Sequence, residues 1–147
     1  MSVFDNLKIS GSALTAQRLR MDVISNNIAN AETTRSADGE PYKRQQVVFS
    51  PIKAPLTART SGGGNLRRSM EEGVRVASIV DDTAPPRMVY DPTHPDADAS
   101  GYVSYPDIDV ITEMTDMISA TRAYEANVTA INAAKAMATK ALEIGRG

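Results

Sequence analysis

The chain has 147 residues, of which 16 are Lys or Arg and 18 are Asp or Glu, and its formal net charge is −2. This length fits one domain of ordinary size, and the lack of a basic excess excludes the strongly basic surfaces by which proteins bind nucleic acid. The absence of cysteine excludes disulfides, thiolate metal sites and cysteine nucleophiles, and without a run of 18 apolar residues no membrane-spanning helix is predicted.

The first predicted element is a helix over residues 3–31. Apolar side chains recur there at alternating spacings of three and four, which is the heptad pattern of a helix that packs along another helix. The first residues have no basic region followed by an apolar region, so we expect no cleaved secretory signal; if the protein leaves the cytoplasm, it does so by another route. The strong heptad positions are Leu7, Leu14, Met21 and Ile28, with Val3 and Ile24 on the same pattern.

This helix is predicted to end within NNIANAETT, residues 26–34. Asn tolerates the left-handed conformation at helix ends, and paired threonines favour leaving the helix. The simplest interpretation is a helix end followed by a turn. Asn26, Asn27 and Asn30 lie within five residues, however, which leaves open that their amides bond backbone groups of a neighbouring helix.

Residues 32–106 are predicted to form a small β-rich insert that begins with a loop. Four short segments with alternating apolar residues follow, and such segments are typical of strands. An insert of this size has little core of its own, so we expect it to pack against the helices or against neighbouring molecules. The four segments are residues 42–52, 73–82, 86–90 and 101–105.

Two details of the insert are specific enough to test. In the second strand, simple alternation places Val74, Val76 and Val80 on one face and Ile79 on the other. Residues 54–70 contain three consecutive glycines without the lysine of a phosphate-binding loop, so a flexible connection is predicted there.

One cluster in the insert could carry chemistry. Asp91, His94, Asp96 and Asp98 lie within eight residues, and an imidazole with three carboxylates could ligate a metal ion. A metal-binding or hydrolytic module is therefore the alternative function. The spacing fits neither a zinc-protease helix nor a calcium loop. Two prolines, and Asp side chains that bond their own backbone, explain the same residues as a rigid exposed turn, so we expect no metal and no cofactor.

The last predicted element is a long helix over residues 107–144. Neither proline nor glycine interrupts it, and most of its residues keep their rotamer freedom in a helix. It would be about 57 Å long, which is more than a domain of this size can enclose. Its heptad pattern runs over four heptads with one lysine in it: Met114, Met117, Thr121, Tyr124, Val128, Ile131, Lys135, Ala138 and Leu142.

Other faces of this helix are also apolar. Ile111, Met114 and Ile118 form a second stripe near its start. Small side chains on several faces let other helices approach closely, so the helix fits either a monomeric bundle or, as we favour, an assembly in which it packs on several neighbours. The alanines concerned are residues 120, 123, 126, 130, 133, 134, 136, 138 and 141.

Together these elements predict a mainly α protein with a small β-rich insert. We expect residues 1–31 and 107–147 to pair as a coiled coil and form one discontinuous core domain, with residues 32–106 packed outside it. A head-to-tail contact that does not close into a ring would then build a filament. The side chains expected to pack between helices or between subunits are Val3, Leu7, Leu14, Met21, Ile24, Ile28, Met114, Met117, Ile118, Tyr124, Val128, Ile131 and Leu142.

Two terminal stretches resemble the signatures of a known family, the flagellar rod, hook and related axial proteins. They are SALTAQRLRMDVISNNIANAETT at residues 12–34 and TRAYEANVTAINAAKAMATKALEI at residues 121–144. Between them, GVRVASIVDD and PRMVYDPTHPDADASGYVSYPDIDV, together with the short length, are similar to a rod protein of this family. Positions within the matching motifs include Asn26, Asn27, Asn30, Thr33, Tyr90, Asp91, Pro92, His94, Pro95 and Asp96.

The resemblance implies a structural subunit of the proximal rod and no enzymatic activity. Its terminal helices would line the inner wall of a helical tube around the export channel. The implied partners are other copies of the chain, the rod proteins FlgB and FlgF, the adaptor FliE and the flagellar type III export apparatus, which would deliver the chain unfolded to the periplasmic space. A scaffold or cap that leaves the finished structure is a further alternative.

Overall fold

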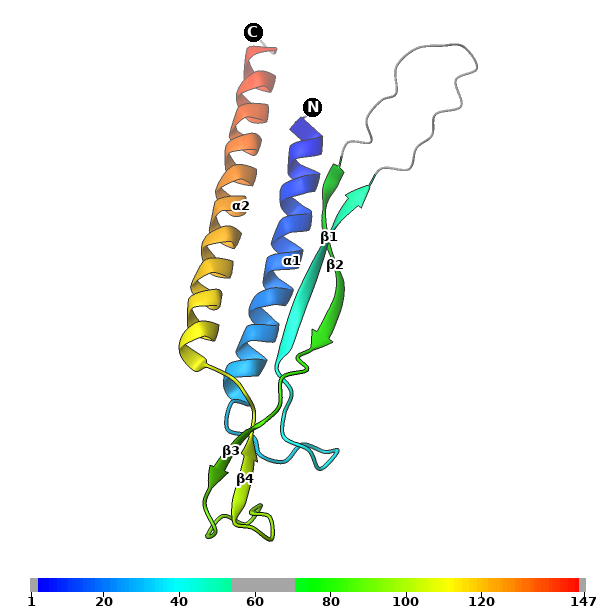
Figure 1. The fold of residues 1–147 in the computed structure, drawn as a ribbon. Coiled ribbons are helices and arrows are strands. Elements are labelled where there is room, and N and C mark those ends of the chain that lie inside the picture. The colour runs from blue at the N-terminus through cyan, green and yellow to red at the C-terminus, as the bar shows by residue number, and fades with distance from the viewer. Residues whose placement is uncertain (1–2, 54–70, 146–147) are drawn as a thin grey trace, which may run out of the picture.

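A computed structural model describes residues 3–53 and 71–145 (Figure 1). Two long helices, α1 (Val3–Ala29) and α2 (Val110–Ile144), lie side by side and run antiparallel. Between them in sequence come four strands: β1 (Gln45–Lys53), β2 (Glu71–Asp81), β3 (Arg87–Tyr90) and β4 (Tyr102–Tyr105). The predicted combination of two terminal helices with a small β insert is confirmed. The flexible connection predicted for residues 54–70 lies outside the described residues.

The boundaries of the helices differ slightly from those predicted. Helix α1 ends at Ala29 instead of residue 31. Helix α2 begins at Val110 instead of residue 107, because Asp109 takes an extended conformation and its side chain accepts a hydrogen bond from the Ile111 N–H. That bond satisfies one of the backbone donors that a helix start leaves free. Hydrogen bonds from Thr112 and from Ile111 hold the pKa of Asp109 below its usual value.

Strands β1 and β2 form an antiparallel hairpin whose pairing is interrupted at Ala77. Val48 pairs with Ser78, but Phe49 pairs with Val76, so one residue of β2 bulges out of the ladder. Directly opposed residues share a face of the sheet. Since Val47 pairs with Ile79 and lies two residues before Phe49, Ile79 shares a face with Val76. The prediction that grouped Val80 with Val76 was therefore wrong.

Helix α1 is the middle layer of the molecule. It contacts α2 on one side and both strands of the β1–β2 hairpin on the other. The hairpin lies close against α1 at Gly73, which has a φ of 128° and whose Cβ position is bordered by Ser12 and Ile9. There the Ser12 hydroxyl accepts a hydrogen bond from the Val74 N–H at 3.1 Å and donates to the Ile9 carbonyl at 2.7 Å. A glycine is required at this point because its backbone conformation is unfavourable for other residues.

Replacing Gly73 with Ala is expected to lower the free energy of unfolding by at least about 1–3 kcal/mol, the range for a non-glycine residue held at an unfavourable φ. The added Cβ would also lie 2.3 Å from the Ser12 Oγ, which the two hydrogen bonds hold in place. Urea unfolding of the purified chain measures the effect. Gly39→Ala is the matched control, because Gly39 has a φ of 81° with nothing near its Cβ position. If Gly73→Ala and Gly39→Ala lowered the free energy of unfolding equally, the close approach of the Cβ to Ser12 would add nothing to the cost of the unfavourable φ.

Strands β3 and β4 form a second, separate hairpin at the end of the molecule where α1 ends and α2 begins. Val103 of β4 is fully buried, whereas every residue of β3 is exposed. In the turn between the strands, Asp91 donates its N–H to the carbonyl of Gly101 at 2.9 Å. This hairpin extends the molecule lengthwise and adds little to its core.

The buried apolar core of the described residues is small. Neither helix in the described ranges is long and apolar enough to cross a membrane. Among the described helices and strands, α2 packs against α1 alone, so most of its surface faces outward. An isolated subunit with so little buried apolar surface should be only marginally stable. The buried apolar side chains are Ala16, Val23, Ile24, Val103, Ala120 and Ala134.

Candidate functional site

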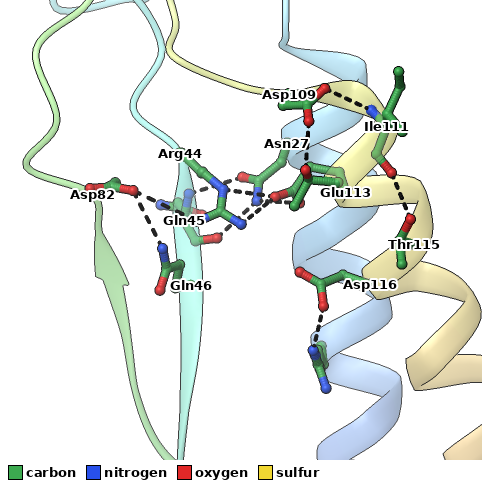
Figure 2. A network of polar contacts seen from close by, with 12 residues as sticks. Asn27, Arg44, Gln45, Gln46, Asp82, Asp109, Ile111, Glu113, Thr115 and Asp116 are labelled. Atoms are coloured by element: carbon green, nitrogen blue, oxygen red, sulfur yellow. Dashed lines mark hydrogen bonds and ion pairs between the residues drawn. The ribbon is translucent and has the colours of Figure 1, made fainter.

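A buried polar cluster joins α1, α2 and the start of β1 (Figure 2). At its centre is Asn27, whose amide nitrogen donates to the Gln45 carbonyl at 2.8 Å and to the Glu113 carboxylate at 3.0 Å. Its amide oxygen accepts from the Gln45 N–H at 2.9 Å and from the Tyr42 hydroxyl at 3.1 Å. An amide offers two donors and two acceptor positions, and here all four are used. Asn27 thereby bonds β1 as a neighbouring strand would.

Glu113 contributes the charge of this cluster from the first turn of α2. It is 1% exposed, as is Asn27. The Arg44 Nε donates to the Glu113 Oε1 at 2.7 Å, and the same guanidinium lies 3.7 Å from Asp82, the residue that follows β2. A carboxylate this deeply buried is tolerated only when it is paired and hydrogen-bonded. Arg44, which precedes β1, therefore connects α2 to the end of the hairpin where β1 begins and β2 ends.

Replacing Tyr42 with Phe is expected to lower the free energy of unfolding by about 0.5–1.5 kcal/mol at neutral pH, the value of one hydrogen bond. Burial raises the pKa of Tyr42, with added contributions from the charges of Asp81 and Glu113. A raised folded-state pKa means that the stabilisation is complete below the unfolded-state pKa and is lost as the pH rises through the folded-state pKa. Urea unfolding between pH 7 and 11 should therefore show a steeper loss above about pH 10 in the wild type than in Y42F. Parallel pH profiles for the two proteins would contradict this assignment.

A groove of about 290 Å³ lies beside the cluster. Its apolar lining comes from Val23 and Ile24 of α1 and from Val47 and Phe49 of β1, and charged side chains line the rest of it together with two glutamines. Its lining contains no Ser, Cys or His, so it offers none of the usual nucleophile–base pairs. The lining is mixed, with four apolar side chains and six charged or amide side chains, and the charged groups among them already pair with one another in the Arg20–Asp116 and Arg44–Glu113 ion pairs.

Helix α2 turns a different column of side chains toward α1 than its heptad pattern predicts. Glu113, Ala120 and Ala134 are buried, and between these positions lie half-buried side chains of the predicted pattern. Met114 and Leu142, by contrast, are 55% and 70% exposed. The predicted seam is thus only partly the face that meets α1. The predicted side chains that are half-buried are Met117, Tyr124, Val128 and Ile131.

On α1 the predicted heptad residues lie mostly in partly buried positions. Ile24 is buried against its neighbours. Met21 receives a long contact from Thr121 of α2, with 3.6 Å between the hydroxyl oxygen and the sulfur, and Arg20 forms an ion pair with Asp116 at 2.9 Å. The side chain of Val3 is outside the described part of the structure. Leu7, Leu14, Met21 and Ile28 are half-buried.

The outward surface of α2 is strongly apolar. Ile111, Met114 and Ile118 lie on one flank at spacings of three and four and are more than half exposed. A second flank is formed by exposed alanines that lead to Met137 and Ile144, both largely exposed. Glu113 and Asn27 are hydrogen-bonded and therefore mark the same level of the two antiparallel helices. From this level α2 continues for 31 residues and α1 reaches back over 24 residues to Val3, so α2 extends about 10 Å past Val3. The exposed flanks are the candidate assembly surface; the alanines are Ala126, Ala130, Ala133 and Ala141.

The other two asparagines of the motif and Thr33 form the end of α1 and the turn after it: Asn26 lies in the last turn of the helix, and Asn30 and Thr33 follow it. The Asn30 amide donates to the Asn26 carbonyl at 2.9 Å, and the Thr33 hydroxyl donates to the Asn30 amide oxygen at 3.2 Å. The interpretation of this stretch as a helix end and turn therefore holds for Asn26 and Asn30. Asn27 instead bonds a strand and a carboxylate on α2, as the cluster above shows.

The segment from Asp91 to Asp98 forms the turn between β3 and β4. The Asp91 carboxylate accepts from the Thr93 N–H at 3.0 Å, and those of Asp98 and Asp96 accept from the Ser100 N–H and the Thr34 hydroxyl at 2.8 Å each. The His94 Nδ1 accepts from the Asp96 N–H at 3.1 Å. These side chains hold the turn and fasten it to the loop after α1. Within residues 3–53 and 71–145 no three His, Cys, Asp or Glu side chains gather as a metal site would require, so the metal alternative gains no support. Tyr90, Pro92 and Pro95 belong to the same hairpin and turn.

Sequence reasoning missed Tyr42, Arg44, Asp82 and Glu113 as members of the polar cluster. Glu113 lies one turn before Met117 on the same side of α2. An acidic residue in line with apolar residues that pack against α1 was the one signal in the sequence that this position is buried and needs a partner. Its partners could not be identified from spacing, because Asn27 is 86 residues away and Arg44 is 69 residues away.

Comparison with known proteins gives matches over the whole chain. Two family descriptions match: "Flagella basal body rod protein" over residues 7–35 and "Flagellar basal body rod FlgEFG protein C-terminal" over residues 99–144. The flagellar basal-body rod protein FlgC of Borreliella burgdorferi is 47% identical, with 100% of each chain covered. FlgC of Bacillus subtilis is 49% identical over 99% of this chain and 100% of the relative, and FlgC of Escherichia coli O6:H1 is 42% identical over 99% and 98%.

Proposed function

Since the chain belongs to the family of the flagellar basal-body rod protein FlgC, and is thus a structural subunit of the basal-body rod, we propose that it assembles through the outward faces of α2. The observation that carries this proposal is the exposed apolar flank of Ile111, Met114 and Ile118. Exposed apolar stripes of this kind mark interaction surfaces. Assembly would supply the burial that the small core of the single chain lacks.

The architecture of the assembled state follows from the same argument. Helices α1 and α2 pair as a coiled-coil core domain made of residues 1–31 and 107–147, and the β insert of residues 32–106 packs outside it. The core domain lines a helical tube around the export channel and transmits torque along it. The α2 column of Met117, Tyr124 and Ile131, half-buried against α1, supports this pairing.

The proposed neighbours are other copies of the chain, the rod proteins FlgB and FlgF, and the adaptor FliE. The proposed location is the periplasmic part of the rod, reached through the flagellar type III export apparatus. A marginally stable chain without cysteine supports this route, because export of an unfolded chain requires that it unfold readily and form no disulfides.

Site-directed crosslinking in purified basal bodies tests the proposal. The chain has no cysteine, so Ile118→Cys introduces a single thiol on the exposed flank of α2. A short bis-maleimide or an oxidant should join this residue to a neighbouring subunit, which mass spectrometry then identifies. Thr83→Cys, at an exposed position of the β insert, is the control and should give less product. Counting copies of the chain in the same preparations separates a permanent subunit from a transient scaffold. Absence of any intersubunit product at position 118, with the variant present in the rod, would overturn the proposal.

A further inference from the structure

We propose that the polar cluster of Asn27, Arg44 and Glu113 sets the rotation of α2 about its own axis, and thereby turns the apolar flank of Met114 outward for assembly. The inference rests on the proposed function and deepens it, because it names the residues that decide which face of α2 is free. None of the three residues needs to touch a neighbouring subunit, so they are positioning residues.

The starting observation is that α2 does not bury its more apolar column. Two columns face α1: the most deeply buried one of Glu113, Ala120, Asn127 and Ala134, and beside it the half-buried one of Met117, Tyr124 and Ile131. The column of Met114, Thr121, Val128, Lys135 and Leu142 runs along the edge of this contact, with Met114 exposed and Thr121 and Val128 half-buried. Adjacent residues on a helix point about 100° apart. Apolar burial alone would favour a helix rotated so that Met114 and Val128 move toward α1. Some other interaction must hold the observed rotation.

The polar contacts of the first two turns provide that interaction. Glu113 points at Asn27 and Arg44, and its oxygens accept from the Asn27 amide at 3.0 Å and from the Arg44 Nε at 2.7 Å (Figure 2). One turn further on, Asp116 accepts from Arg20 at 2.9 Å. Rotating Met114 inward would carry both carboxylates away from their partners. It would also leave the amide of Asn27, which is 1% exposed, with an unused donor.

The two ion pairs are not equivalent. In the Arg20–Asp116 pair both side chains are about one third exposed, so water can replace either partner. In the cluster, Asn27 also bonds both the N–H and the carbonyl of Gln45, and Arg44 also reaches Asp82. Asn27 and Arg44 are therefore held in place by the β1–β2 hairpin as well as by α1. Glu113 can bond them only when α2 has the observed rotation. This makes Glu113 the residue of α2 that sets the rotation.

The test compares the wild-type chain with N27L/E113L, which replaces both buried partners with apolar groups of similar size. Each carries the reporter Met114→Cys, whose thiol is unique because the chain has no cysteine. Gln45 and Arg44 lose partners in this variant, but the apolar seam can now close on α1, so we expect both helices to remain formed and the far-UV helicity to match that of the wild type. We expect the reporter thiol to react with a maleimide about fivefold more slowly, because it has lost most of its exposure. Incorporation of N27L/E113L, without the reporter, into basal bodies should fall about tenfold, because the docking flank is turned inward.

Two control variants sharpen the interpretation. Glu113→Gln keeps an acceptor for the Asn27 amide and should label and assemble as the wild type does. R20L/D116L removes the exposed pair between the same two helices and should leave the labelling of the reporter thiol unchanged.

Each other outcome counts against the inference. Labelling of the reporter thiol at the wild-type rate in N27L/E113L would show that the cluster does not set the rotation. A double variant that loses its helicity would show that the cluster merely holds the fold. Slow labelling with normal incorporation would show that the rotation does not control docking. If Met114→Asp in the otherwise wild-type chain assembles normally, the proposed docking face fails, while the labelling experiment still decides the rotation.

Discussion

Met114→Asp is expected to remove the chain from assembled rods while leaving the subunit folded. Met114 is 55% exposed and lies on the flank that faces away from α1, so an aspartate there remains solvated in the free subunit. In the proposed assembly the same position is covered by a neighbouring helix. The variant would then forfeit the roughly 1.5–3 kcal/mol of a buried apolar side chain and also desolvate a charge.

A loss of about 3 kcal/mol per contact corresponds to a reduction in docking affinity of about a hundredfold, and the loss is repeated at every copy. Quantitative mass spectrometry of purified basal bodies measures incorporation, and swimming in soft agar measures motility. Thermal unfolding of the purified subunit should be unchanged. Met114→Leu is the matched control, because it keeps the apolar surface and should assemble. Normal incorporation of Met114→Asp, or an equal loss with Met114→Leu, would be incompatible with an apolar docking flank.

The long helices could be predicted from local signals alone. The run from Asp107 to Ile144 has neither proline nor glycine, and an aspartate at position 109 is a typical helix N-cap. The strands were also predictable, because their alternation is local and turn residues separate them. The bulge at Ala77 was not, because no glycine or proline marks it and only pairing with the other strand creates it.

The sequence did not predict which face of α2 packs against α1. Periodicity ranks columns by apolar content, and it correctly ranks the column of Met114 above that of Glu113. The structure buries Glu113 because Asn27 and Arg44 bind it, and those residues come from other parts of the chain. In a subunit that assembles with others, the most apolar column of a helix can remain exposed for a physical reason. If that column were buried within the chain, less apolar surface would remain for contact with neighbouring subunits.

Arg44→Met is expected to destabilise the chain by about 3–5 kcal/mol, the range for removing one partner of a buried ion pair. Glu113, whose side chain is 2% exposed, would stay buried with Asn27 as its remaining partner and no positive charge within the cluster. The stability of small domains is typically about 5–15 kcal/mol, and the small core of this chain places it near the lower end. Much of the purified Arg44→Met chain should therefore be unfolded at 25 °C, with reduced far-UV helicity and an early urea transition.

Adding Glu113→Gln to Arg44→Met tests whether the unpaired charge of Glu113 causes the loss of stability. R44M/E113Q has no buried charge to compensate, and its glutamine can still accept from the Asn27 amide. We expect this double variant to recover more than half of the lost free energy, although Glu113→Gln alone should cost about 1–2 kcal/mol through the weakened bond to Arg44. Such a sign reversal between backgrounds requires that Arg44 and Glu113 interact directly. Additive losses would mean that Arg44 acts through packing or through Asp82, and that the carboxylate of Glu113 finds its compensation elsewhere.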